Sequence, residues 1–121
     1  MAGCPSPFVA AGLSWPNQVL PSGYWYDDAS RYNIALTFPE DMETTIPLDS
    51  ANWRFKRNGV IVGTVTGREW ETTKKLILHV YEDRLYDGTF TLDYTKNSEE
   101  LVTSEFQPYQ YWNNLSTPYE S

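Results

Sequence analysis

Thiol and imidazole chemistry is almost absent from this sequence. Cys4 is the only cysteine and His79 the only histidine among 121 residues. A single cysteine excludes an intrachain disulfide and a zinc site built from thiolates. A single histidine leaves one candidate base for a serine or cysteine nucleophile. The sequence therefore predicts a protein that is not an enzyme and that binds no metal or cofactor.

Positive charge is scarce as well. Nine Lys and Arg stand against sixteen Asp and Glu, which gives a formal net charge of -7. A negative chain is repelled at long range by phosphate backbones and by anionic lipid headgroups. No apolar run approaches the roughly 20 residues that a membrane-spanning helix needs. We therefore expect no nucleic-acid partner and no membrane insertion.

Aromatic residues are abundant by contrast. Five Trp, nine Tyr and five Phe, within a hydrophobic fraction of 40%, suffice for one core in a chain of this length. Composition divides the chain into an N-terminal arm at residues 1–30, a body at residues 31–105, and a last strand or second arm at residues 106–121. The first of these holds four of the eight prolines and no Lys or Arg, which predicts an extended segment that lies on a surface.

The body alternates apolar and polar residues, a pattern typical of strands with one buried face. Ile34, Leu36 and Phe38 share one face of a predicted strand, and residues 76–80 and 90–94 alternate in the same way. Asn58-Gly59 supplies the two positive-φ residues of a type I′ hairpin turn. Helical patterns are missing between these strands, apart from a possible turn at residues 98–102. The sequence predicts an all-β protein, an antiparallel sandwich or barrel.

The body also carries a longer pattern of strand and turn residues. In order along the chain its pieces are Ile34-Ala35-Leu36-Thr37-Phe38, Glu40-Asp41-Met42, Leu48-Asp49-Ser50-Ala51-Asn52-Trp53, Asn58-Gly59, Val65-Thr66-Gly67, Leu76-Ile77-Leu78-His79-Val80 and Gly88-Thr89-Phe90-Thr91-Leu92-Asp93-Tyr94-Thr95. Together they resemble the bacterial Ig-like repeat of cyanobacterial swimming-motility surface proteins and large adhesins. The resemblance spans about half of the chain. It implies a seven-stranded immunoglobulin-like β-sandwich that acts as a spacer or adhesive module, usually in tandem on exported proteins.

The layout of this chain differs from such tandem arrays. It has one copy of the pattern, flanked by aromatic arms, and its first residues lack the basic and apolar regions of a secretory signal. Ala2 also stands where N-myristoylation requires glycine. This layout is similar to that of accessory proteins of tailed-phage virions, which decorate capsids, tails and fibres and leave the cell by lysis. We therefore expect a virion protein, with a cell-surface or extracellular protein as the alternative.

Aromatic residues near the two ends of the chain are the candidate binding residues. They are Phe8, Trp15, Tyr24, Trp25, Tyr26, Tyr109, Tyr111 and Trp112. Tyr and Trp anchor many protein interfaces, so the leading hypothesis is a non-enzymatic structural module that binds itself or other virion subunits. Because flat rings also stack on sugars, a module that binds carbohydrate or a cell surface is the alternative. A third interpretation is that alternate rings complete the sandwich core.

Charged side chains are predicted to lie in solvent. The acidic pairs, such as Glu99-Glu100, fall at predicted turns or strand ends. If loops at one end bring Asp83 and Asp87 near Glu40-Asp41, their oxygens offer a calcium site, although no Asp-x-Asp-x-Asp-Gly loop is present. We expect His79 on the polar face of its strand. Six of the nine basic residues fall within residues 54–75, and a solvated strand face is favoured there over a docking patch.

Overall fold

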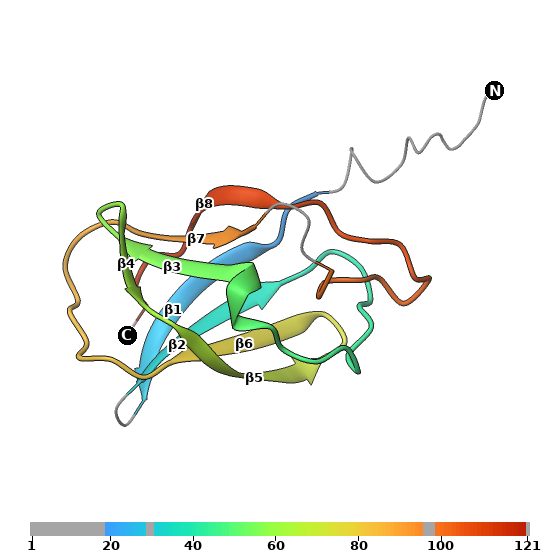
Figure 1. Cartoon of the computed structure of the whole chain (residues 1–121), viewed down its shortest axis with the longest axis horizontal. Coiled ribbons are helices and arrows are strands. Elements are labelled where there is room, and N and C mark those ends of the chain that lie inside the picture. The colour runs from blue at the N-terminus through green and yellow to red at the C-terminus, as the bar shows by residue number, and fades with distance from the viewer. Residues whose placement is uncertain (1–18, 29–30, 96–98, 121) are drawn as a thin grey trace.

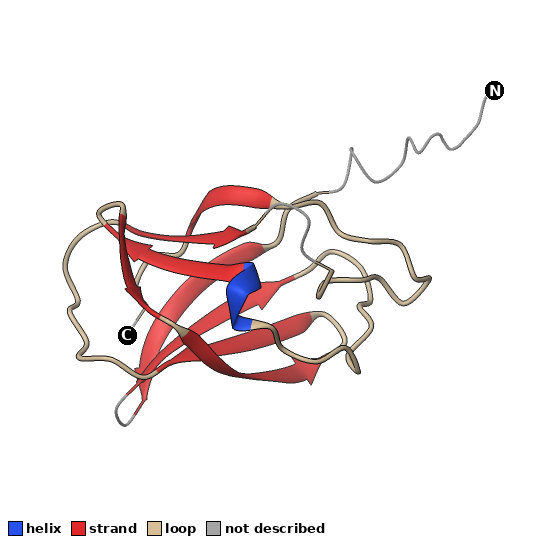
Figure 2. Cartoon of the chain, in the orientation of Figure 1, coloured by secondary structure: helices blue, strands red, loops and turns tan. Residues whose placement is uncertain are grey.

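The computed structural model describes residues 19–28, 31–95 and 99–120. Within these ranges the chain forms eight β-strands in two antiparallel sheets, with almost no helix (Figure 1, Figure 2). The first sheet has the order β1 (Ser22–Asp28), β2 (Arg31–Thr37), β6 (Lys75–Val80), β5 (Val65–Thr72). The second has the order β4 (Val60–Gly63), β3 (Trp53–Arg57), β7 (Phe90–Tyr94), β8 (Trp112–Ser116). The all-β class and the β-sandwich are confirmed, and the Ig-like identity remains a prediction.

The core consists of the alternating apolar residues that the sequence analysis placed on inner faces. Ile34, Leu36 and Phe38 are buried, and so are the inward residues of β6 and β7. Aromatic rings from both sheets meet in this layer. The Trp25 ring lies 4.7 Å from Tyr32, in the first sheet, and 5.0 Å from Phe90, in the second, between ring centroids. These contacts join the two sheets.

The chain passes from one sheet to the other at both sides of the sandwich. On one side only Thr64 separates β4 from β5, so an almost continuous strand leaves the second sheet and enters the first. On the other side the segment after β8 crosses to the edge of β1. There the Trp25 amide donates to the Pro118 carbonyl at 2.9 Å, and the Glu120 amide donates to the Trp25 carbonyl at 2.8 Å. The C-terminal segment thus covers the edge of β1.

The predicted hairpin turn at Asn58-Gly59 is confirmed. Asn58 has a φ of 52° and Gly59 a φ of 82°, the left-handed region that a type I′ turn requires at both positions. The helical turn expected at residues 98–102 is wrong for its described part, because the Leu101 carbonyl accepts from the Tyr109 amide at 2.9 Å in an extended segment. A short 3-10 helix, Ser50–Asn52, occurs instead, where the Asp49 carboxylate accepts from the Ala51 amide.

The boundaries of the predicted arms require correction. Residues 22–28, which we assigned to the arm, form β1 and pair with β2 over their full length, with Trp25 opposite Ile34. This segment forms a strand because its side chains alternate: Tyr24 and Tyr26 point to the outer face and Trp25 to the core. For residues 106–121 the sequence left a last strand and a second arm as alternatives, and the structure has a strand there, β8. Residues 1–18 of the predicted arm lie outside the described residues.

Replacing Trp25 tests whether this ring joins the sheets. Trp25 is fully buried, and removal of a buried indole costs about 3–5 kcal/mol through lost transfer energy and the cavity left behind. We expect Trp25→Ala to lower the free energy of unfolding by that amount in urea denaturation. Tyr111→Ala, at a ring that is 45% exposed, is the matched control and should change it by less than about 1 kcal/mol. Equal effects of the two substitutions would contradict the assignment.

Candidate functional site

The predicted binding residues occupy three different environments. Trp25, Tyr109 and Trp112 are buried in the core, so the interpretation in which rings complete the sandwich holds for these three. Their expected role as surface anchors is wrong because each ring is enclosed by other core side chains. Tyr111 is exposed, and Tyr24 and Tyr26 are half-buried on the outer face of the first sheet. Phe8 and Trp15 lie outside the described residues.

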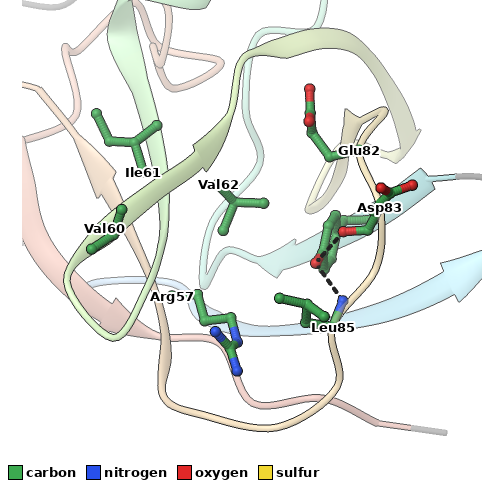
Figure 3. Close-up of a pocket in the computed structure, with 8 residues that line it drawn as sticks. Arg57, Val60, Ile61, Val62, Glu82, Asp83 and Leu85 are labelled. Carbon is green, nitrogen blue, oxygen red and sulfur yellow. Dashed lines mark hydrogen bonds between the residues drawn. The ribbon is translucent and has the colours of Figure 1, made fainter.

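Exposed aliphatic side chains gather instead at the end of the sandwich where the β3–β4 hairpin meets the loop of residues 81–89. Val60 is 70% exposed, Ile61 55% and Leu85 50%. They border a hollow of about 230 Å³ (Figure 3). Its lining residues are Tyr32, Arg57, Val60, Ile61, Val62, Glu82, Asp83 and Leu85. An apolar cluster of this kind marks a candidate contact site, since single exposed aliphatic residues are common but clusters are not.

A buried tyrosine holds the loop wall of this hollow in place. The Tyr32 hydroxyl donates to the Asp83 carbonyl at 3.1 Å and accepts from the Leu85 amide at 2.8 Å (Figure 3). Tyr32 itself is fully buried, with its ring packed 5.3 Å from Phe55. Because one rigid side chain satisfies two backbone groups of the loop, Leu85 is presented at a fixed place relative to β4.

The far end of the same loop is tied to the β3–β4 hairpin. The Arg57 guanidinium donates to the Asp87 carbonyl at 2.7 Å and to its carboxylate at 2.8 Å. This hydrogen bond to Arg57 holds the pKa of Asp87 below its ordinary value. Gly88, with a φ of 106°, packs closely on the hairpin, where an added Cβ would lie 3.0 Å from the Asn58 side chain. Both walls of the hollow are therefore anchored.

The strand wall of the hollow is an edge strand. β4 is the terminal strand of the second sheet, so one row of its backbone groups is not used by a neighbouring strand. Glu82 lies against Gly63 at the end of β4, where an added Cβ would be 2.5 Å from the Glu82 side chain. With Asp83 it places carboxylates beside the aliphatic residues. The site offers an apolar surface, an open strand edge and a negative rim.

A second surface with aromatic residues lies on the outer face of the first sheet. The Tyr24 and Tyr26 rings are 6.1 Å apart, and with Lys75 and Glu120 they border a hollow of about 400 Å³. The Lys75 ammonium lies 3.2 Å from the Glu71 carboxylate and 6.0 Å from the Tyr24 ring. Its hydrogen bond to Glu71 raises the pKa of Lys75. The cation thus lies over part of the aromatic surface.

His79 is buried on this outer face, contrary to the surface position that we expected. It is 6% exposed, and its Nδ1 lies 2.8 Å from the Asn33 Oδ1. Because the Asn33 amide nitrogen donates to the Tyr26 carbonyl, that oxygen faces the ring and the Nδ1 carries the proton. The His79 Nε2 lies 3.3 Å from the Glu69 carboxylate. In the neutral ring Nδ1 thus donates to Asn33 on β2, whereas Nε2 pairs with Glu69 on β5 only when the ring is protonated.

Glu100 is a second polar residue that sequence reasoning misplaced. Predicted to be a solvated turn carboxylate, it is 2% exposed. Its Oε1 accepts from the Trp53 indole at 2.9 Å and from the Asp49 amide at 3.0 Å, while its Oε2 lies 3.4 Å from Arg68. The carboxylate satisfies polar groups of the 3-10 turn and of the core, which is a structural role.

The remaining charged residues of the described ranges are spread over the fold. Asp83 lies beside Tyr32 at one end of β2, whereas Asp41 accepts from Thr73 at the other end, so the acids considered for a calcium site are far apart. In the part of the chain that the structure describes, no group of three or more His, Cys, Asp or Glu is placed to hold a metal ion. Four of the six basic residues of the 54–75 region are in separate ion pairs, namely Lys56 with Asp93, Arg57 with Asp87, Arg68 with Glu100 and Lys75 with Glu71.

Comparisons of this chain with models of protein families, with curated proteins and with solved structures found no match. The resemblance to bacterial Ig-like repeats and the similarity of layout to virion proteins therefore stay predictions. Over the described ranges, no helix is long and apolar enough to cross a membrane. The candidate site at β4 accordingly depends on geometry alone.

The lone imidazole allows a direct test of the outer-face arrangement. Burial lowers the pKa of His79 below its ordinary value of 6.5, and the positive charge of Arg31 acts in the same direction. The folded protein thus binds the proton less readily than the unfolded chain, so the stability that neutral His79 contributes is present above pH 6.5 and is lost as pH falls below it. An NMR titration of the imidazole should give a midpoint below 6.5.

The stability of a variant provides the control for this titration. His79→Gln keeps a side chain that can donate to Asn33 but does not titrate, and it should flatten the loss of unfolding free energy as pH falls below 6.5. An imidazole midpoint at or above 6.5 would contradict the claim that burial keeps this ring neutral.

Proposed function

We propose that this chain is a non-enzymatic assembly module that joins copies of itself by docking an apolar segment at the hollow beside β4. The single observation that carries the proposal is the cluster of Val60, Ile61 and Leu85, exposed at 50–70% and held on two anchored walls. Removing one aliphatic side chain of this size fully from water contributes about 1.5–3 kcal/mol. Three such residues at one site form the apolar centre of a contact, and each is already partly covered.

The positions of the titratable groups support a role without catalysis. General acid–base chemistry needs a side chain whose proton can reach a substrate. The imidazole of His79 is enclosed between Asn33 and Glu69, and Glu100 is enclosed by Trp53 and Arg68. These groups are committed to contacts within the fold.

We place this assembly in a phage virion, as a capsid decoration or as a tail or fibre accessory. The support is the sequence layout of one Ig-like pattern flanked by an aromatic, lysine-free segment, together with a rigid sandwich that exposes an apolar contact at one end. A particle made of many copies gains from such contacts, because each adds to the stability of the whole.

Carbohydrate binding is a second candidate function, favoured by the adjacent rings of Tyr24 and Tyr26 beside a hollow. Two tyrosines on the flat outer face of a sheet offer a surface on which a sugar can stack. It is the weaker candidate because Lys75, tied to Glu71, lies over the Tyr24 ring that a sugar would cover.

Charge introduced at the hollow tests the proposed function. Ile61→Glu places a carboxylate on the exposed apolar wall beside Glu82 and Asp83, so docking of an apolar segment should be lost while the fold is kept. Asn113→Glu, at an exposed position on β8 at the opposite edge of the same sheet, is the matched control. Multi-angle light scattering over a hundredfold range of concentration gives the mass.

We expect the wild-type protein and Asn113→Glu to increase in mean mass with concentration, and Ile61→Glu to remain at the monomer mass of 14.0 kDa. Circular dichroism and the melting temperature should be alike for all three proteins. An Ile61→Glu protein that associates as the wild type does would remove the hollow from the function, and a wild-type protein that stays monomeric throughout would refute self-assembly.

A further inference from the structure

We infer that the segment that docks beside β4 is Phe8–Trp15 of a second copy, added to the edge of β4 as an extra strand. This inference rests on the proposed function and names the occupant of its site. It makes the contact directional, because the hollow of one molecule takes the segment of the next. Three features support it: the chemistry of the segment, the edge that it meets, and the distance from which it starts.

The chemistry of the segment matches that of the hollow. Residues 1–18 contain no Asp, Glu, Lys or Arg, although the whole chain carries a net charge of -7. An uncharged segment enters a site bordered by Glu82 and Asp83 without the repulsion that the acidic parts of the chain would meet. Within the segment, Phe8, Val9, Leu13 and Trp15 are the large apolar residues. Their burial against Val60, Ile61 and Leu85 is the driving force.

The same segment is suited to adding a strand. The run Phe-Val-Ala-Ala-Gly-Leu-Ser-Trp lies between Pro7 and Pro16 and contains no proline itself, so every residue whose amide faces a neighbouring strand can donate to it. This length exceeds the five to six residues of an average strand. The terminal strand β4 provides a row of backbone groups for such an addition. Backbone pairing then supplements the apolar contact.

The starting point of the segment keeps Trp15 away from the hollow of its own molecule. Val19 lies at the Phe38 end of the sandwich, because its carbonyl accepts from the Tyr109 hydroxyl and the Tyr109 ring packs 5.3 Å from Phe38. The hollow lies at the opposite end of β2, where Tyr32 forms its floor. Six residues of strand separate these ends, a length of about 20 Å.

The two points also lie on opposite sides of the sandwich. β1 and β5 are the outermost strands of the first sheet, about 14 Å apart at three strand spacings, and the chain continues from β4 into β5. Figure 1 shows β4 remote from the beginning of β1. Residues 16–18, which link Trp15 to Val19, allow a Cα separation of about 14 Å at full extension. In its own molecule Trp15 therefore stays short of the hollow, so a run that docks there over its full length, Trp15 included, comes from another molecule.

A contact between two different surfaces has a defined consequence for assembly. Such heterologous contacts build open chains, or rings where the rotation between copies closes. Each molecule has one segment and one hollow, so growth continues from both ends. A molecule that lacks either one can only terminate a chain.

Proline substitutions separate strand addition from general apolar contact. Ala11→Pro removes a backbone amide in the middle of the run and keeps its apolar character, whereas Ala2→Pro, the matched control, lies outside the run. Both positions are outside the sandwich that the structure describes, so its stability should be unchanged. We expect Ala11→Pro to be monomeric in light scattering and Ala2→Pro to associate as the wild type does.

Mixing two defective variants gives the decisive result. Ile61→Glu keeps the segment and Ala11→Pro keeps the hollow, so each is monomeric alone but the mixture should form a one-to-one dimer of twice the monomer mass and grow no further. If Ala11→Pro associates as the wild type does while Ile61→Glu stays monomeric, the hollow is a docking site for something else, and the inference fails while the proposed function stands. If both variants associate as the wild type does, both are wrong.

Discussion

The packing of Trp25 is the interaction on which the rest of this structure depends. Its ring lies 4.4 Å from Tyr119, 5.0 Å from Phe90 and 5.8 Å from Tyr86, so one side chain of β1 touches the C-terminal segment, the second sheet and the loop after β6. Asp27, next to it, accepts from the hydroxyls of Tyr119 and Tyr86 at 3.0 and 3.1 Å. The hydrogen bond from Tyr119 is the main cause of the lowered pKa of Asp27.

This packing also determines the candidate site. The loop that forms one wall of the hollow is fixed through Tyr86 on Trp25 and through the Tyr32 hydroxyl, and both anchors belong to the core. The two sides of the sandwich differ as a result. At the β1 side the C-terminal segment covers the strand edge, whereas at the other side β4 is terminal and its aliphatic residues are exposed. β5 and β8 are terminal strands too, but the exposed aliphatic cluster lies at β4, so a segment that docks there joins molecules in one direction.

Sequence patterns predicted the parts of the fold that are encoded locally. Alternation gave the inner face of β2 through Ile34, Leu36 and Phe38, and Asn58-Gly59 gave the hairpin, because each depends on neighbouring residues alone. β1 was missed because Tyr24, Trp25 and Tyr26 are all aromatic and show no contrast between its faces. The burial of His79 and Glu100 was missed because it depends on partners more than 30 residues away in the chain, such as Asn33 and Arg68.

A local signal for the hollow was nevertheless present. Val60, Ile61 and Val62 are consecutive, and three apolar residues in a row on a strand must expose at least one of them unless both faces are covered. Whether that exposure forms a site depends on Leu85, 24 positions after Ile61, and on the hydroxyl of Tyr32 that holds it. The alternation of apolar and polar residues reports on neighbours in the sequence and cannot indicate contacts between residues so far apart in the chain.

The most direct measurement of the central claim is amide hydrogen exchange at β4 in the assembled protein. If a strand from a second copy pairs with this edge, exchange at residues 60–63 should be slower in the wild-type protein at high concentration than in monomeric Ala11→Pro, with residues 8–15 protected in parallel. Equal exchange at residues 60–63 in the two proteins, while the wild type remains associated, would contradict the account and place the contact elsewhere on the molecule.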